Sequence, residues 1–397
     1  MKVLHINTTD NGGAAIACRR IHEGLLKKGV DSKLLLLKKT KSIERAYSFD
    51  KSFTVSFLRR IKNTFIQDEK KLEQKKKEYS IEIFSNPFSN FDITKHSLYN
   101  DADIIQLNWV SGFLDEPSFF KKNTKPVIWR MADLYACGGG YHYETGFPFE
   151  SFKKELSINN KIRQQALKDA DITFVPISNW VKQKAGESIL INNFKKQVIH
   201  NGIDFSIYKS HDQKTSRSFF GLDHDKRILL FGAEYFTHAR KGFKLLIEAI
   251  AKLDVGNIQL VVFGSQMADI SLANKNFISV GPIDNENKLS MLYSAADYFI
   301  MPSIEEAFGQ VFIEALASGT PVVAFPNGGA LDIIIDGFNG VIAESFSSNS
   351  LALTIEKALG INFHRDKILN DVRQRFNIDD KVDEYISLYE RMIKSTT

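Results

Sequence analysis

The chain has 397 residues, which is long for one α/β domain and sufficient for two of ordinary size. With 43% hydrophobic and 25% charged residues, it has the composition of a folded globular protein and not of a disordered one. The net charge of +5 gives little reason to expect nucleic acid as a partner, and two cysteines, Cys18 and Cys137, exclude a disulfide framework and a clustered zinc site.

Neither the first residues nor the rest of the chain lead us to expect a secreted or membrane-spanning protein. A short apolar run turns polar at Asn7, so we expect no signal peptide. No stretch approaches about 18 uninterrupted apolar residues, so no membrane-spanning helix is predicted. The cysteine usage fits a reducing compartment.

The N-terminal segment has the pattern of a strand, a helix and a second strand. The helix is predicted over residues 14–28, where apolar residues recur at helical spacing, and it ends at Gly29. A glycine-bearing turn over residues 8–13 separates it from the first strand at 3–6. The continuous apolar run within 33–38 is typical of a parallel strand covered on both faces.

Residues 41–100 interrupt this pattern with a basic insertion. Between Lys51 and Ser80 there are nine Lys or Arg and four Asp or Glu, an excess of five positive charges. Apolar residues are interleaved with these charges, which predicts an amphipathic helical insertion. It could contact an anionic membrane, to which each well-placed cation contributes about 1 kcal/mol. Alternatively, it is a solvated helical hairpin that packs its phenylalanines on the domain.

Alternating strands and helices then resume and continue towards the C-terminus. This alternation predicts parallel sheets. The predicted strands are 103–107, 126–129, 172–175, 228–231, 259–263, 277–280, 298–301 and 321–324, and the helices between them are 158–169, 243–253, 285–295 and 309–317.

A division of the series near residues 200–225 predicts two doubly wound, Rossmann-like domains facing a central cleft. The first would comprise residues 1–203 with the insertion, and the second residues 204–375. Residues 376–397 are expected to form a helix that could cross back to the first domain. Since ligands of such sheets bind at the carboxyl ends of the strands, the cleft is the expected site.

The segment 303–314 carries the strongest chemical signal. It follows a predicted buried strand and opens a helix, whose first N–H groups favour anions, and Gly309 would let a phosphate approach closely. Glu306 is expected in the loop at the strand's carboxyl end. Glu314 falls among apolar residues, where a buried carboxylate needs a partner such as a ribose hydroxyl. The simpler interpretation is an acidic helix start that the helix dipole stabilises, with an exposed glutamate behind it.

The stretch 306–324 resembles glycosyltransferase family 4, retaining enzymes of the GT-B fold. Further motifs of that family follow in the same order along nearly the whole chain. They are Gly12-Gly13, His200-Asn-Gly-Ile-Asp204, the segments 240–249 and 281–303, and Gly328-Gly329 with 336–340.

The resemblance is to bacterial enzymes of the exopolysaccharide, O-antigen and colanic-acid type. It implies an enzyme that moves a sugar from a UDP- or GDP-sugar to a glycan or lipid-linked acceptor in surface polysaccharide biosynthesis. The nucleotide sugar would be a substrate, and neither a metal nor another cofactor is implied. The first domain would hold the acceptor, and the protein would be cytoplasmic, with a possible peripheral contact at the inner face of the cell membrane.

The resemblance also assigns residues of the donor side, with Glu306 and Lys241 as expected catalytic residues. Glu306 would bind hydroxyls of the donor sugar, and Glu314 would hold the ribose. Lys241 would neutralise the diphosphate as it departs, together with Arg240. The remaining assignments are backbone contacts: Phe308, Gly309 and Gln310 to the diphosphate, Gly12 and Gly13 to the phosphates across the cleft, and Ile283 to the base. Without a ligand, residues 240–241 would be a solvated helix start and Gly12-Gly13 a tight turn.

The segment 129–143 departs from the family pattern. It resembles a subgroup that reads Trp-Thr-Leu-His-Asp-Met-Trp followed by glycines and His-Tyr, but here Ala132 stands where that subgroup has histidine. Asp133 is retained and is carried over as a catalytic residue. Arg130 and His142 are the acceptor-side candidates, although a lone histidine such as His142 is often only a satisfied polar residue. A second departure is the segment 231–235, where many relatives carry arginine.

Two alternatives stay open on the sequence. The loss of histidine at Ala132 is compatible with a nucleotide-sugar-binding protein that has no transfer activity. An epimerase of similar two-domain shape is the other, although Lys241 with Glu306 and Glu314 fits a transferase better. A dinucleotide oxidoreductase is disfavoured, because the first turn reads Asp10-Asn-Gly-Gly13 and not G-x-G-x-x-G.

Overall fold

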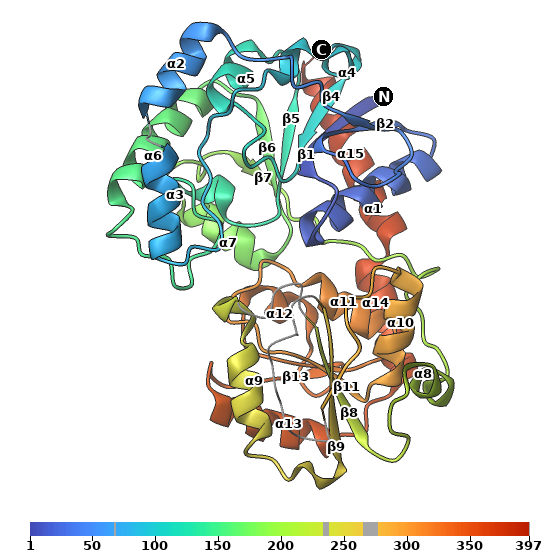
Figure 1. Ribbon diagram of the computed structural model, residues 1–397. Helices are drawn as coiled ribbons and strands as arrows, with labels where there is room; N and C mark the ends of the chain where they lie inside the picture. The colour runs from blue at the N-terminus through green and yellow to red at the C-terminus, as the bar shows by residue number, and fades with distance from the viewer. Residues whose placement is uncertain (67–68, 233–237, 265–276, 397) are drawn as a thin grey trace. The chain divides into compact units, whose positions relative to one another are not determined.

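The computed structural model describes residues 1–66, 69–232, 238–264 and 277–396 (Figure 1). The chain divides into two compact units: unit 1 is Met1–Gly202 with Ile378–Thr397, and unit 2 is Ile203–Asn377. Each unit is built on a parallel sheet with helices, which confirms the predicted α/β class of two parallel-sheet domains. Among the described residues, none of the helices combines the length and the apolar character that crossing a membrane requires.

The sheet of unit 1 has seven strands in the order β3-β2-β1-β4-β5-β6-β7. In its centre, Ile6 pairs with Leu35 on one side and with Leu107 on the other. All three side chains are fully buried, as expected for parallel strands covered on both faces. The strands are β1 (Lys2–Thr9), β2 (Asp31–Lys38), β3 (Ala46–Ser48), β4 (Ile104–Leu107), β5 (Val127–Met131), β6 (Ile172–Pro176) and β7 (Lys195–Lys196).

The C-terminal helix completes the core of unit 1. It packs beside the first helix of the chain, and Val382 and Tyr385 from it share a core cluster with Ile21, Leu25 and Ile128. The helices of unit 1 are α1 (Gly13–Lys27), α2 (Phe57–Ile66), α3 (Glu69–Glu78), α4 (Ser97–Asp101), α5 (Glu116–Lys122), α6 (Lys153–Leu167), α7 (Asn179–Glu187) and α15 (Ile378–Thr396), with the short turns η1 (Ile93–Lys95) and η2 (Tyr135–Cys137).

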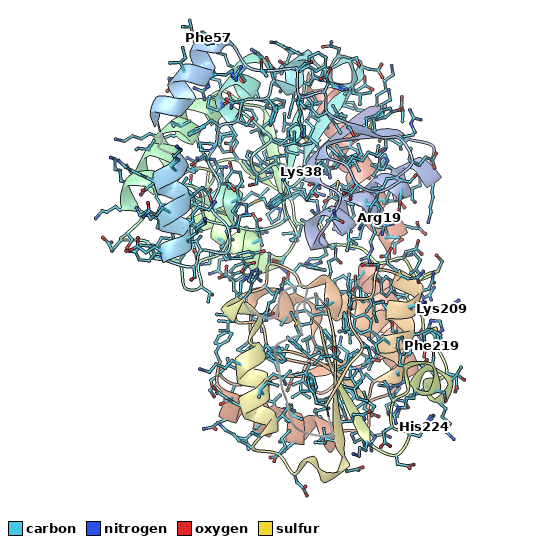
Figure 2. The ribbon with its side chains drawn as sticks, viewed as in Figure 1. Arg19, Lys38, Phe57, Lys209, Phe219 and His224 are labelled. Carbon is cyan, nitrogen blue, oxygen red and sulfur yellow. The ribbon has the colours of Figure 1, made fainter. Side chains whose placement is uncertain are left out.

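The insertion contains the edge strand β3, the helices α2 and α3, the turn η1 and most of α4. Helix α3 packs on the unit through Leu72, which is buried in a cluster with Phe84 and Phe152. Helix α2 behaves differently: its Phe57 and Leu58 are 73% and 78% exposed (Figure 2). Helix α3 therefore packs on the unit through a leucine and contains no phenylalanine, and Phe57 at the start of α2 is exposed, contrary to the expectation that the hairpin packs its phenylalanines on the domain.

The sheet of unit 2 has six strands in the order β10-β9-β8-β11-β12-β13. They are β8 (Arg227–Gly232), β9 (Ile258–Phe263), β10 (Phe277–Ser279), β11 (Tyr298–Met301), β12 (Val322–Ala324) and β13 (Gly340–Ile342). The helices are α8 (Gln213–Phe220), α9 (Phe243–Ile250), α10 (Glu286–Ala295), α11 (Gln310–Ala317), α12 (Gly328–Ile333), α13 (Ser348–Leu359) and α14 (Arg365–Phe376), with the turns η3 (Ala239–Lys241) and η4 (Val255–Asn257).

The strands and helices predicted from periodicity are present, with ends that differ by a few residues. The largest difference is at α6, predicted to start at residue 158, which begins at Lys153. Three short edge strands, β3, β7 and β13, were not predicted, because two or three residues show little periodicity; the three-residue strands β10 and β12 were predicted within the longer apolar segments 277–280 and 321–324.

A buried ion pair holds the segment that follows β5. Arg163 of α6 donates from Nε to Oε2 of Glu116 at 3.0 Å, and both side chains are fully buried. The same guanidinium donates to the carbonyl of Tyr135 at 2.6 Å and to that of Gly138. The Tyr135 hydroxyl donates to the other oxygen of Glu116 at 2.7 Å. Helices α5 and α6 are thereby tied to the backbone of residues 135–138.

We predict that Arg163→Ala lowers the free energy of unfolding by about 3–5 kcal/mol, because it leaves the carboxylate of Glu116 buried without its cation. Urea unfolding followed by circular dichroism measures the change. Lys153→Ala, on the same helix, is the matched control, since its pair with Glu150 at 3.6 Å is open to water. Equal stability of the two variants would contradict the prediction.

Candidate active site

Glu306 lies in the loop that follows β11. The strand ends at Met301 and α11 begins at Gln310, so residues 302–309 form the connection at the strand's carboxyl end, as predicted. Gly309 precedes the helix with a φ of 86°, a left-handed conformation that favours glycine. The N–H groups of a helix's first turn have no partner within the helix and favour an anion, so the amides assigned to the diphosphate stand at such a helix start.

A second loop is packed against this one. It contains η3 with Arg240 and Lys241, followed by Gly242 at a φ of 70°. A side chain at Gly242 would place its Cβ 1.9 Å from the carbonyl oxygen of Pro302. Only glycine, which has no Cβ, lets the two loops approach this closely. The amide of Ile304 donates to the carbonyl of Arg240 at 2.8 Å, which fixes their register.

The two loops bring Arg240, Lys241 and Glu306 together. Lys241 Nζ donates to Glu306 Oε2 at 2.8 Å, and Arg240 Nη1 lies 3.7 Å from the same oxygen. Arg240 is buried and also donates to the carbonyl of Glu305 at 3.1 Å. Burial raises the pKa of Glu306, but the charges of Lys241 and Arg240 outweigh it and hold the pKa below its ordinary value of 4.5.

The start of α12 supports the loop from a third side. The amide of Gly329 donates to the carbonyl of Glu306 at 2.9 Å. A Cβ at Gly329 would lie 2.2 Å from the carbonyl oxygen of Phe308, so this glycine permits close backbone contact. Residues 306–309 are therefore held by their neighbours before any ligand binds. Of the segment 231–235, where relatives often carry arginine, residues 233–235 lie outside the part of the chain that the structure describes.

Glu314 and Ile283 lie on other parts of unit 2. Glu314 is 5% exposed within α11, and the hydroxyl of Tyr293 donates to its Oε2 at 3.3 Å. The predicted partner for this buried carboxylate is thus at least partly supplied by the protein. Ile283 is half-buried in the connection between β10 and α10. The assigned contacts of Glu314 with a ribose and of Ile283 with a base stay predictions.

Gly12 and Gly13 form the turn between β1 and α1 of unit 1. Gly12 has a φ of 87°, and a Cβ built on either glycine meets open space. Asp10 anchors the turn, because its Oδ2 accepts the amides of Thr40 and Lys41 at 2.6 and 2.7 Å. Burial raises the pKa of Asp10, but these hydrogen bonds lower it below its ordinary value. The predicted phosphate contact of the two glycines stays a prediction.

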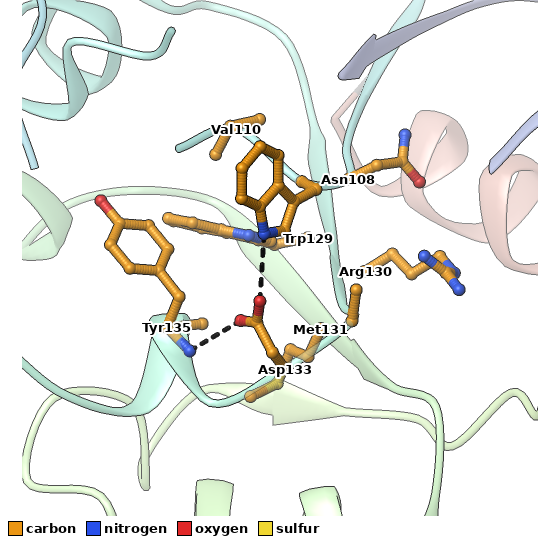
Figure 3. A pocket seen from close by; sticks show the side chains of 10 residues that line it. Asn108, Val110, Trp129, Arg130, Met131, Asp133 and Tyr135 are labelled. Carbon is orange, nitrogen blue, oxygen red and sulfur yellow. Dashed lines mark hydrogen bonds between the residues drawn. The ribbon is translucent and has the colours of Figure 1, made fainter. Parts of the chain in front are cut away.

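The structure joins Asp133 to His142 inside unit 1. His142 Nδ1 and Asp133 Oδ2 are 2.6 Å apart, and His142 is fully buried. The same Asp133 oxygen accepts from the indole of Trp109 at 3.1 Å, and Oδ1 accepts from the amide of Tyr135 at 2.9 Å (Figure 3). His142 is therefore the histidine that this chain brings to Asp133, although it lies nine residues further along.

Arg130 lies near Asp133, but its guanidinium takes no part in this network. It is 1% exposed and its Nη2 donates to the side-chain carbonyl of Asn201 at 2.6 Å. Figure 3 shows the guanidinium pointing away from the carboxylate of Asp133. Alternate residues of β5 face opposite sides of the sheet, so Arg130 enters the interior of unit 1 on the same side as Ile128.

Three residues of this network were not predicted from the sequence. Trp109 follows β4, Ser85 belongs to the insertion, and Tyr135 begins η2. Ser85 Oγ lies 2.8 Å from His142 Nε2, across 57 residues of sequence. Polar residues at such separations give no local pattern, so only the fold could show that they meet.

Comparison with known protein families finds a match within unit 2. Residues 212–375 match the family described as Glycosyl transferases group 1. An uncharacterized glycosyltransferase of Methanocaldococcus jannaschii is 30% identical over 232 residues, which are 54% of this chain and 59% of that protein. The D-inositol 3-phosphate glycosyltransferase of Mycobacteroides abscessus is 25% identical over 62% of this chain and 57% of its own length. The chain thus spans less than two thirds of these relatives.

Solved glycosyltransferases share the fold. Sucrose-phosphate synthase from Thermosynechococcus elongatus has a TM-score of 0.71 at 16% identity, covering 100% of both chains. Anabaena HepE, solved with UDP and glucose, has a TM-score of 0.68 at 15% identity, covering 98% of this chain and 99% of its own. These likenesses confirm the predicted GT-B class as a fold of two parallel-sheet α/β domains. The match to the family described as Glycosyl transferases group 1, residues 212–375, falls on nearly the whole of unit 2.

Proposed function

We propose that this chain is a retaining glycosyltransferase of family 4 that moves a sugar from a nucleotide sugar to a glycan or lipid-linked acceptor in surface polysaccharide biosynthesis. The main support for this proposal is the contact of Lys241 and Arg240 with Glu306 beside the start of α11. A UDP-sugar is the first donor to test, because HepE, which shares the fold, was solved with UDP-glucose.

The arrangement suits the two ends of such a donor. A diphosphate matches the charge of Lys241 and the N–H groups at the start of α11. Sugar hydroxyls match the carboxylate of Glu306, whose lowered pKa keeps it ionised at neutral pH. Glu314, on the second turn of α11, would bind the ribose beside Tyr293. Neutralisation by these groups would make a metal unnecessary.

The reaction follows from this placement. The bond between the anomeric carbon and the diphosphate breaks while the acceptor oxygen bonds to that carbon on the same face. The acceptor's proton passes to the departing phosphate oxygen, so the protein contributes positioning and charge stabilisation more than a base. Lys241 would stabilise the negative charge as it develops on the leaving group.

We also propose that helix α2 attaches the protein to the cytoplasmic face of an anionic membrane. Phe57 and Leu58 present an exposed apolar surface at the start of α2, and Arg60 is an exposed cation on the same helix. Lys70 and Lys71 are exposed at the start of α3. A helix with apolar residues on one side and cations beside them is suited to lie in the headgroup region. Arg59 differs from these cations, because it pairs with the buried Asp115 at 3.3 Å.

We predict that a nucleotide sugar raises the melting temperature of the wild-type protein and that Lys241→Ala removes most of this effect. A panel of UDP-glucose, UDP-galactose and GDP-mannose, read by thermal shift, identifies the donor. With that donor, Lys241→Ala and Glu306→Gln should each reduce transfer by about 100-fold or more, because charge stabilisation of the leaving group or orientation of the sugar is lost.

Lys357→Ala is the matched control for this experiment, since Lys357 makes an exposed pair with Asp336 at 3.1 Å elsewhere in unit 2. Wild-type rates in both site variants would overturn the assignment of Glu306 and Lys241. Donor binding without transfer to any acceptor would instead favour the non-catalytic nucleotide-sugar-binding protein.

The pH dependence of stability provides an independent prediction for Glu306. Its pKa is lowered in the folded state, so the carboxylate stabilises the fold above its ordinary pKa of 4.5, and this contribution is lost as the pH falls below that value. We expect Glu306→Gln to lower the free energy of unfolding by about 1–3 kcal/mol at neutral pH, with a difference from wild type that shrinks in acid. Urea unfolding at several pH values measures it, and a difference that grows in acid would contradict the prediction.

The membrane proposal predicts that Phe57→Glu with Leu58→Glu abolishes flotation with vesicles of equal parts phosphatidylglycerol and phosphatidylcholine. The reason is that the variant removes the apolar surface and adds negative charge. Phe219→Glu is the matched control, because Phe219 is 55% exposed on α8 of unit 2 (Figure 2). Flotation of the α2 variant equal to that of the control would refute attachment through this helix.

A further inference from the structure

The carboxylate of Asp133 has three hydrogen-bond donors and room for a fourth. Oδ2 accepts from His142 and from the indole of Trp109, and Oδ1 accepts from the amide of Tyr135. A carboxylate offers about four acceptor positions, two on each oxygen. One position on Oδ1 therefore has no donor among the residues that the structure describes.

A small cavity lies beside this carboxylate. Its walls include Asn108, Trp109, Trp129 and Ala132, together with Asp133 (Figure 3). The centre of a water-sized sphere can move through about 10 Å³ of it. The cavity therefore has room for one water molecule or one hydroxyl group and for nothing larger. Ala132 contributes only a methyl group to the wall. The half-buried indole of Trp109 gives the cavity an aromatic edge.

His142 fixes the orientation of Asp133. With Nδ1–H donating to Asp133, His142 Nε2 can accept from the hydroxyl of Ser85 at 2.8 Å, so one tautomer satisfies both ring nitrogens. The ring of Tyr135 is stacked on the imidazole with centroids 5.0 Å apart and an angle of 18°. The hydroxyl of Ser85 is in turn in contact with that of Ser111. The imidazole has no freedom to turn without losing these partners.

Stability alone does not require such a network. Buried polar groups are desolvated at a cost that their hydrogen bonds roughly repay, and apolar residues of the same volume often serve a core equally well. What the network does provide is a carboxylate with a fixed direction and a single open acceptor position next to a cavity of matching size. This is the arrangement of a recognition point for one hydroxyl group.

We propose that Asp133 binds one hydroxyl group of an acceptor sugar in this cavity and that His142 is the residue that positions it. The hydroxyl donates to the open position on Oδ1, while the ring of the sugar stays outside against the edge of Trp109, whose apolar face suits the C–H face of a sugar. The inference rests on the proposed glycosyl transfer, from which it takes the acceptor's chemical class. It adds the atom that recognises the acceptor and the reason for its orientation.

The test is the binding of methyl α-D-glucopyranoside and methyl α-D-galactopyranoside, with their monodeoxy derivatives, to the full chain by ligand-observed NMR. Removal of one particular hydroxyl should weaken binding about tenfold or more, and removal of the others should change it little. Asp133→Asn should abolish this discrimination between the parent sugar and that derivative. Because asparagine has the shape of aspartate, this variant tests the open acceptor position with little disturbance of the fold.

The positioning role of His142 is tested by a pair of variants. His142→Phe removes both hydrogen bonds and should abolish the same discrimination, whereas His142→Asn keeps a donor for Asp133 and should restore part of it. His22→Asn is the matched control, because His22 is also fully buried and contacts Ser32 at 2.7 Å and the carbonyl of Glu44 at 2.8 Å. A partial rescue by asparagine would separate orientation of Asp133 from simple packing.

Two results would overturn the proposal. One is equal binding of every deoxy sugar by wild type and the Asp133 variant, and the other is a crystal structure with saturating glycoside in which an ordered water alone occupies the cavity. These experiments need no nucleotide sugar. Failure of the donor site therefore shows in the thermal-shift panel with Lys241→Ala, and failure of the hydroxyl-binding point shows here.

Discussion

Parallel strands covered by helices on both faces leave little room for ionisable side chains along the buried strands. Desolvation makes a charge along such a strand expensive, whereas the loops at the carboxyl ends can carry carboxylates and cations with partners. Glu306 follows β11, Asp133 follows β5, and the Gly12 turn follows β1. The exceptions show the cost. His5, buried in β1, has its pKa lowered well below the ordinary value, chiefly by burial and then by the nearby charges of His22 and Arg130.

The two units hold their loops by different means. In unit 2 the backbone does it: glycines 242 and 329 allow chains to touch where any side chain would collide, so residues 302–309 are fixed by close packing. In unit 1 a buried ion pair does it, since Arg163 binds Glu116 and the carbonyls of Tyr135 and Gly138 together. Both devices preorganise a carboxylate, Glu306 in one unit and Asp133 in the other, and preorganised groups need no rearrangement when charge or a hydroxyl arrives.

Much of the fold could be predicted from the sequence, because helices and buried strands impose a period on apolar residues. The short edge strands β3 and β13 were missed, since three residues show little periodicity, and only the equally short β10 and β12, which lie in longer apolar segments, were predicted. In the same way, Glu306 and Lys241 were predicted from continuous motifs, and the structure brings them within 2.8 Å. Ser85 and Trp109 were missed because they reach His142 and Asp133 only through the tertiary fold. Arg130 was grouped with His142 as an acceptor-side candidate by its place in the sequence, yet its guanidinium binds Asn201 and points away from Asp133 (Figure 3).

Donor and acceptor recognition in the proposed reaction depend on different parts of the chain. The family match covers 212–375 and therefore unit 2, whose cations and carboxylate suit the diphosphate and sugar that donors have in common. Acceptors differ from one another, and the features that could recognise them lie in unit 1, in the exposed α2 helix and the Asp133 network. There, Ala132 and His142 are complementary: the small residue leaves room beside the carboxylate, and the histidine from a later turn holds it in place. A change at one of these positions would therefore be expected to require a change at the other, because a larger side chain at 132 would fill the cavity that His142 orients Asp133 towards.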